Sequence, residues 1–220
     1  MLLVDLSHVI EDEMTTCPGL PGPRVREHLS FEDSAARYAP GTEFSIGEIT
    51  MVGNTGTYLD TPAHRFRDGY DLSGLLLERC AMLPAAVFDC DGAIGPPLFA
   101  DVELTGMAVL LRTGWDRHWR SDRYGGPEHP FLTEAGAQAL VEKGAALVGI
   151  DSVNIDDTRT GHRPAHTVLL AAGVPVVEHL TRLGHLPRTG AHFSAVPPAV
   201  RGLATFPVRA FAVLPDDEPI

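Results

Sequence analysis

The fold class is decided by the stretch TEAGAQALVEKGAALVGID, residues 133–151. Thr133 is a preferred N-cap residue and Gly144 a preferred C-terminal stop, so the segment between them is predicted to be a helix. The apolar run that follows, residues 145–151, has the composition and length of a strand. A helix that leads directly into an apolar strand is typical of α/β proteins.

The same alternation continues on both sides of this stretch. A second unit comprises a helix from about His166 to Ala172, Gly173 as its C-cap, and a strand over 174–180. The remaining predicted elements are strands at 44–52, 85–89, 107–113 and 207–214, a short helix at 72–80, and loops at 17–23 and 115–130. Together they predict an α/β fold, a mixed sheet with packed helices.

Length and charge exclude several classes of protein. The 220 residues are 44% hydrophobic and 21% charged, with no repeat or long linker, which predicts one domain over residues 1–220. A net charge of -12 argues against nucleic acid, polyphosphate substrates and anionic membranes as partners. The start of the chain lacks a basic region, and the longest apolar run, 168–177, is too short to span a bilayer. We therefore expect a cytoplasmic protein.

The numbers of lysines, cysteines and histidines limit which catalytic side chains can be expected. Lys143 is the one lysine and lies on a predicted helix, so lysine-based catalysis has a poorly placed candidate. The 3 cysteines form no Cys-x-x-Cys pair and no disulfide framework. Because the chain carries 10 histidines and many carboxylates, chemistry based on these two side chains is the default expectation.

Two segments bring such residues together. The first is NTGTYLDTPAH, residues 54–64, where Gly56 and Pro62 bend the chain so that polar side chains can converge, although a solvated turn would have the same composition. The second contains His166 and Glu178. A carboxylate inside the apolar strand 174–180 would be buried unless it is paired, protonated or bound to a metal, and a salt bridge at the strand end is the simpler alternative.

The first segment resembles the signature His-x-Gly-Thr-His-x-Asp-x-Pro-x-His of the cyclase superfamily, which includes bacterial kynurenine formamidases and isatin hydrolase. Further matching segments are Asp5–His8, Pro18–Gly19, Leu111–Trp115, Gly149–Asp151, His166–Leu170 and Gly173–Glu178. The resemblance implies a swivelling β/β/α-type fold, a homodimer or homotetramer, and a divalent metal site, often zinc or manganese.

Residue by residue, the resemblance assigns Asp60, His166 and Glu178 as metal ligands and His64 as the catalytic acid and base. The chain departs from the signature at Asn54 and Tyr58, which replace two ligand histidines. An amide oxygen and a neutral phenol bind zinc less well than imidazole does. Both a bound Zn or Mn ion and a site without metal therefore stay open. Cys17, Pro18 and Trp115 are the predicted substrate-binding residues.

Three functions follow from these residues. The first is metal-assisted hydrolysis or closure of a C–N or C–O bond in a small aromatic amide, formamide, lactam or lactone. The second is a metal-independent cyclase, dehydratase or isomerase of a polyketide-like pathway, in which Asp60 orients His64 as the base and Tyr58 acts as the acid. The third, a binding protein that has lost its activity, is disfavoured because the acidic and histidine residues remain.

Overall fold

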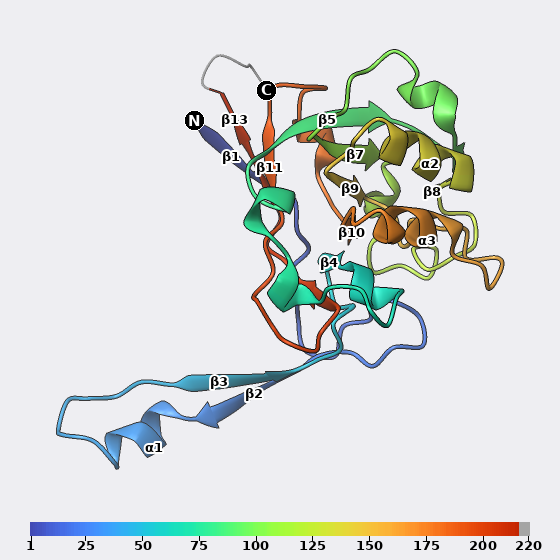
Figure 1. Ribbon diagram of the computed structural model, residues 1–220. Helices are drawn as coiled ribbons and strands as arrows, with labels where there is room; N and C mark the ends of the chain where they lie inside the picture. Colours follow the sequence, from blue (N-terminus) through green and yellow to red (C-terminus); the bar gives the residue numbers. More distant parts are fainter. Residues whose placement is uncertain (216–220) are drawn as a thin grey trace.

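The computed structural model describes residues 1–215, so the last five residues of the predicted domain lie outside the described part (Figure 1). Its centre is a nine-stranded sheet in the order β1-β13-β11-β5-β7-β9-β10-β4-β12. The strands of this sheet are β1 (Leu2–Asp5), β4 (Tyr58–Asp60), β5 (Leu83–Asp89), β7 (Ala108–Arg112), β9 (Leu147–Ile150), β10 (Val176–Glu178), β11 (His192–Ser194), β12 (Thr205–Pro207) and β13 (Phe211–Leu214).

The sheet is mixed. Its middle strands β5, β7, β9 and β10 are parallel, and the strands added on both sides pair antiparallel. The two long helices, α2 (Glu134–Glu142) and α3 (Pro164–Ala171), lie together beside the parallel strands (Figure 1). The predicted mixed sheet with packed helices is therefore confirmed. The sheet is large and curled, and it carries few helices.

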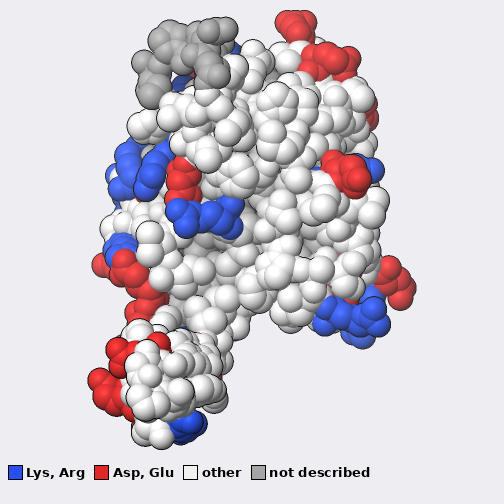
Figure 2. Space-filling view, turned by 90° about the vertical axis from the view of Figure 1, so that its left-hand side faces the viewer, with Lys and Arg blue, Asp and Glu red and all other residues white. Residues whose placement is uncertain are grey.

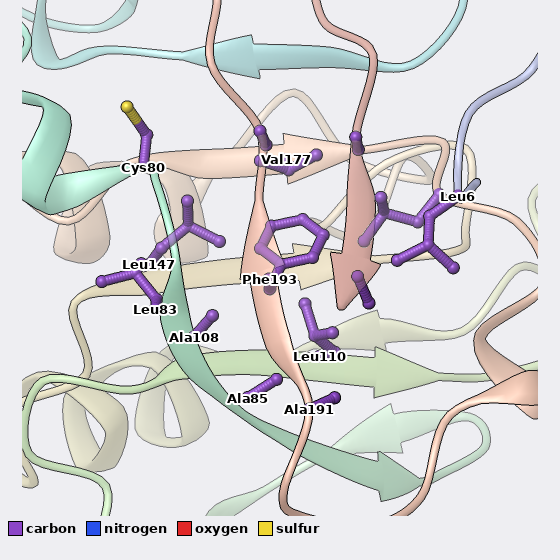
Figure 3. Packing of buried hydrophobic residues seen from close by; sticks show 14 of the residues in the cluster. Leu6, Cys80, Leu83, Ala85, Ala108, Leu110, Leu147, Val177, Ala191 and Phe193 are labelled. Carbon is purple, nitrogen blue, oxygen red and sulfur yellow. The ribbon is translucent and has the colours of Figure 1, made fainter. Parts of the chain in front are cut away.

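Both faces of the central strands are buried, as expected for parallel strands. On one face Val109 and Leu111 pack with Leu140 of α2 and Leu169 of α3. On the other face, the neighbouring residues of the same strand pack against the curled ends of the sheet (Figure 3). The residues of this second core include Ala108, Leu110, Val177, Phe193, Ala212 and Leu6. The curled ends of the sheet thus cover the face of the central strands that lies opposite the helices.

One part of the chain projects away from this body. Strands β2 (Arg24–Leu29) and β3 (Ile46–Thr50) form an antiparallel hairpin that carries α1 (Phe31–Ala35) at its far end (Figure 1). We call residues 24–50 the arm. In Figure 2 the arm extends below the body, and acidic and basic side chains are interspersed with uncharged ones on the face shown. The last pair of strands, β6 (Ala93–Ile94) and β8 (Phe131–Leu132), is short and parallel.

Most elements agree with their predictions. Helix α2 begins after Thr133, whose hydroxyl accepts a hydrogen bond from the Gly136 N–H, and Gly144 has the positive φ of a helix stop. Helix α3 starts two residues earlier than expected, at Pro164. Strands β5, β7, β9 and β10 lie within or overlap the predicted runs.

Three local predictions were wrong or incomplete. Residues 72–80 form two short 3-10 turns, Leu72–Gly74 and Leu77–Arg79, in place of a helix. The predicted run 207–214 is divided between the end of β12 and β13. The strand predicted at 44–52 exists as β3, but all its residues are exposed in the arm.

In residues 1–215, no helix combines the length and the apolar composition that a bilayer-spanning helix needs.

Candidate active site

Strand β4 positions the central residues of the site. It lies between β10 and β12, and its register places Tyr58 opposite Glu178 and Asp60 opposite Thr205. Since successive side chains of a strand alternate between its faces, Tyr58 and Asp60 share one face while Leu59 enters the core. Gly53 allows the preceding loop to lie against β12, because a Cβ there would be 2.4 Å from the carbonyl oxygen of Thr205.

Tyr58 and Glu178 are joined by a buried hydrogen bond. The Tyr58 hydroxyl donates to Glu178 Oε2 at 2.6 Å, and the backbone N–H of Ile155 donates to Oε1 at 2.6 Å. Burial and the charge of Glu178 raise the pKa of Tyr58 well above its ordinary value, so the phenol keeps its proton and stays a donor. Both carboxylate oxygens of Glu178 therefore already have a donor from the protein.

Asp60 and Thr205 orient His64. The hydroxyl of Thr205 donates to Asp60 Oδ1 and lies 3.0 Å from His64 Nδ1, which is 3.3 Å from Asp60 Oδ1. Because the hydroxyl proton of Thr205 points to Asp60, its oxygen is free to accept the Nδ1 proton of His64. This arrangement leaves the other ring nitrogen, Nε2, with the lone pair. The His64 side chain is 34% exposed, so it is accessible to a substrate.

His166 is held from the opposite side by Asp156. The carboxylate of Asp156 lies 2.6 Å from His166 Nδ1 and accepts hydrogen bonds from the backbone N–H groups of Ala165 and His166 at the start of α3. One side chain thus caps the helix and fixes the imidazole ring. A carboxylate on one ring nitrogen directs the other nitrogen, Nε2, toward the site and makes it a better ligand.

Among residues 1–215, two buried atoms of the site have no hydrogen-bond partner. They are Asp60 Oδ2 and His166 Nε2, which lie 3.6 Å apart. His166 Nε2 is also 3.6 Å from Glu178 Oε1. Ligand-type atoms of Asp60, His64 and His166 lie within 4.8 Å of one another, and this group can hold a metal ion. Two tetrahedral zinc ligands are expected to be about 3.3 Å apart, given metal–ligand distances of about 2.0–2.1 Å.

The electrostatics of the cluster also suit a cation. Burial alone would lower the pKa of His166, but the carboxylates of Glu178, Asp156 and Asp60 outweigh it and raise that pKa to about 10. Burial would raise the pKa of Asp60, yet His166, His64 and Thr205 hold it below its ordinary value. The pKa of Glu178 is raised, chiefly by burial. Three buried carboxylates thus surround one imidazole, an arrangement that additional positive charge would stabilise.

The site opens into a small cavity of about 110 Å³. Its walls contain the predicted residues Asn54, Tyr58, His64, His166 and Glu178, together with Arg65, Asn154 and Arg163, which the sequence did not single out. Asp60 lies beneath this wall and is fully buried. The structure therefore brings together the six residues of the two polar segments, which are separated by about a hundred positions in the chain.

The three predicted substrate-binding residues lie outside this cavity, and their role stays a prediction. Cys17 is 3.7 Å from His179 Nε2, and burial and then the charge of Glu178 raise its pKa to about 12. Pro18 lines a separate cavity of about 580 Å³. Trp115 is buried and donates from Nε1 to the carbonyl oxygen of Tyr124 at 2.9 Å.

Two positioning residues escaped the sequence reasoning. They are Asp156 and Thr205, which belong to neither of the two polar segments. Neither has a local pattern that separates it from an ordinary polar residue. Thr205 reaches the site through the pairing of β12 with β4, and Asp156 reaches it through the start of α3. Only the tertiary structure reveals these two contacts.

The fold and the site define an α/β protein with a curled mixed sheet and a buried cluster of carboxylates and histidines. The family model described as "Putative cyclase" matches residues 4–157. The chain belongs to this cyclase family.

Comparison with known proteins agrees with this assignment over nearly the whole chain. The kynurenine formamidase of Bacillus cytotoxicus is 29% identical over 211 residues, which cover 94% of this chain and 95% of the relative. The kynurenine formamidase of Bacillus cereus is 28% identical with the same coverage.

Solved structures show the same fold. Isatin hydrolase A from Labrenzia aggregata, bound to benzyl benzoate, has a TM-score of 0.83 at 24% identity and covers 97% of this chain and 93% of its own. A structure described as a potential metal-dependent hydrolase with cyclase activity has a TM-score of 0.77 at 25% identity, with 99% of both chains covered.

Proposed function

We propose that this protein hydrolyses, or closes, the C–N or C–O bond of a small aromatic amide, formamide, lactam or lactone with the help of a divalent cation. The observation that carries the proposal is the pair of unpartnered buried atoms, Asp60 Oδ2 and His166 Nε2, beside His64. Relatives named kynurenine formamidase and isatin hydrolase support the substrate class.

The residues present fit a zinc or manganese ion. Asp60 and His166 would supply the first two ligand atoms, with Glu178 as a further donor. A nearby carboxylate and imidazole suit both metals. Such a cation supplies Lewis acidity, which polarises a carbonyl group and lowers the pKa of water. The amide of Asn54 and the phenol of Tyr58, which replace two imidazoles of the family signature, leave the cation with fewer strong ligands.

His64 carries the proton transfer in this proposal. Its Nδ1 is held by Thr205 and Asp60, which leaves Nε2 as the base of a residue that lines the cavity. Nε2 takes a proton from the attacking water and returns it to the leaving nitrogen or oxygen of the substrate. Asp60 keeps the ring oriented and stabilises the imidazolium that forms in between. Tyr58 holds Glu178 in place by its hydrogen bond.

A second candidate, a metal-independent cyclase, dehydratase or isomerase, is favoured by one specific observation. Tyr58 and His64 both line the cavity, so a residue with a phenol and one with an imidazole border the same small volume. In that reaction His64 is the base, Asp60 orients it, and Tyr58 is the acid. The two candidates differ in whether the activity needs a cation.

The test is a panel of aromatic formamides, amides, lactams and lactones, assayed with protein that was stripped by chelator and then reloaded with Zn or Mn. We expect turnover that returns with the metal and falls by about a hundredfold to ten-thousandfold in His64→Gln, the range seen for acid–base groups. His185→Gln, an exposed histidine away from the site, is the control. Full activity of the stripped protein would favour the second candidate, and full activity of His64→Gln would refute both.

The arm supports the predicted homodimer or homotetramer. An isolated two-stranded hairpin is only marginally stable in water. The paired residues Val25 and Ile49 are 49% and 47% exposed, and Ile46 is 45% exposed. Covering these side chains with a second copy of the chain would stabilise the arm. The oligomer and the cytoplasmic location both stay predictions.

A further inference from the structure

The catalytic cavity is too small for the whole of an aromatic substrate. Its volume is about 110 Å³, whereas pockets for drug-sized ligands are usually about 300–1,000 Å³. It therefore accepts the reacting group, and the rest of the molecule must lie elsewhere. A second cavity of about 470 Å³ is built from the start of α3 and from residues 161–163 before it, with Arg65 and Glu134.

Two arginines belong to the walls of both cavities. Arg65 follows His64 directly in the chain, and Arg163 precedes α3. A molecule whose reacting group lies beside His64 and whose remainder lies in the larger cavity must pass these two guanidinium groups. The position makes them the first charged groups that the non-reacting part of a substrate meets.

Neither guanidinium is neutralised by a carboxylate of the described residues. Within residues 1–215, no carboxylate lies within 4.0 Å of either one. Arg65 donates from Nε to the hydroxyl of Thr167 at 3.0 Å. Arg163 donates from one terminal nitrogen to backbone carbonyl oxygens, among them those of Thr160 and His162. Other N–H groups of both side chains stay available, and two positive charges without a partner are unusual on a chain of net charge -12.

We propose that Arg65 and Arg163 form an anion subsite that binds a carboxylate on the non-reacting part of the substrate. The planar fork of a guanidinium matches a carboxylate with two parallel hydrogen bonds. Glu134 in the same wall offsets one of the two positive charges, and the remaining single positive charge is matched by a monoanion such as a carboxylate. The inference rests on the proposed function, since it assigns the remainder of the same substrate.

The subsite is tested with two matched pairs of compounds. The reactive pair is 2-formamidobenzoate and 2-formamidobenzamide, which differ only in the charge of one substituent. The unreactive pair is benzoate and benzamide, whose binding is measured by calorimetry with the metal-loaded protein. The variants are Arg65→Met and Arg163→Met, and the control is Arg67→Met, which removes the same charge from a position outside both cavities.

We expect the wild type to prefer the carboxylate of each pair by about tenfold or more, as one charge-assisted hydrogen bond provides. Arg65→Met should reduce this preference at least severalfold, and Arg67→Met should keep it. Arg163→Met is expected to act in the same way, but its loss of carbonyl contacts can disturb the loop 157–162. Added methylguanidinium should then restore binding of benzoate to either variant.

Two results would overturn the inference. The first is a wild type that handles the neutral and the charged compound equally. The second is an unchanged preference in both Arg65→Met and Arg163→Met. If neither formamide reacts but the benzoate preference is present and depends on Arg65, the proposed function fails while the anion subsite stands.

Discussion

The two halves of the site differ in how far the protein has satisfied its own polar atoms. In one half, Glu178 receives hydrogen bonds on both oxygens, from Tyr58 and Ile155. In the other half, Asp60 Oδ2 and His166 Nε2 are also buried but have no partner in the described part of the chain. Buried polar groups are normally hydrogen-bonded, so an exception is a place to look for function. The first half is held mainly by the protein's own hydrogen bonds, and the second offers the unpartnered atoms to which a ligand can bind first.

The pairing of β4 with its neighbours explains this difference. Tyr58 lies directly opposite Glu178, so a phenol and a carboxylate meet across two strands. Asp60 lies opposite Val176, whose side chain offers no donor, and opposite Thr205, whose hydroxyl reaches only Oδ1. The second oxygen of Asp60 is thus left free by the register itself. A different residue at either neighbouring position would change which half is open.

The largest expected effect comes from Asp60→Asn. This change removes the negative charge of Asp60, in the half of the site whose buried atoms lack a partner, and keeps the shape of the side chain. The amide can neither serve as an anionic ligand nor stabilise a positive His64 ring. We expect kcat to fall by about a thousandfold to ten-thousandfold, the loss known for an Asp that orients a catalytic histidine. Steady-state kinetics on the best substrate of the panel would measure it.

Asp68→Asn is the matched control for this change, since Asp68 is an exposed carboxylate away from the cavity. Circular dichroism would establish that both variants fold. If the Asp60→Asn protein keeps more than about a tenth of the wild-type kcat, Asp60 matters no more for activity than the Tyr58–Glu178 pair does. That result would contradict the difference between the two halves of the site.

A smaller effect is expected from Tyr58→Phe, which removes the hydrogen bond from the Tyr58 hydroxyl to Glu178. Glu178 loses one donor but keeps the N–H of Ile155. The free energy of unfolding should fall by about 1–3 kcal/mol, as for other hydrogen bonds to buried charged groups. Urea denaturation of the metal-free protein would measure this loss, and kcat should change by less than about tenfold.

Tyr70→Phe provides the comparison, because the Tyr70 hydroxyl donates to the carbonyl oxygen of Gly173 outside the site. A loss of kcat beyond about a hundredfold in Tyr58→Phe alone would assign the phenol to proton transfer and support the metal-independent reaction.

The sequence predicted the framework better than the strand that carries the site. Helix α2 and strand β9 follow from Thr133, Gly144 and a continuous apolar run, all of which are local signals. Strand β4 was missed, because residues 54–64 contain the turn-forming Gly56 and Pro62 and only three residues of the strand between them. Strand β3 was found, but its alternating apolar residues face solvent in the arm. Local pattern cannot tell an exposed ribbon from a half-buried strand.

The candidate site could be predicted only in part for a similar reason. The signature and the acidic residue of an apolar strand pointed to Asp60, His64, His166 and Glu178, which do converge. The contacts that decide their chemistry come from residues without a local signal. Asp156 and Thr205 orient the two histidines, and the two arginines of the cavity wall are distant from each other in sequence.

The most direct test of the role of Asp60 and His166 is a measurement of metal binding. Protein stripped by chelator is dialysed against Zn or Mn, and bound metal is measured by plasma mass spectrometry for the wild type, Asp60→Asn and the control Asp68→Asn. The predicted result is about one ion per chain in the wild type and in Asp68→Asn, and little in Asp60→Asn. Equal metal content in all three proteins, or none in the wild type, would contradict the assignment of Asp60 and His166 as the ligand-binding half of the site.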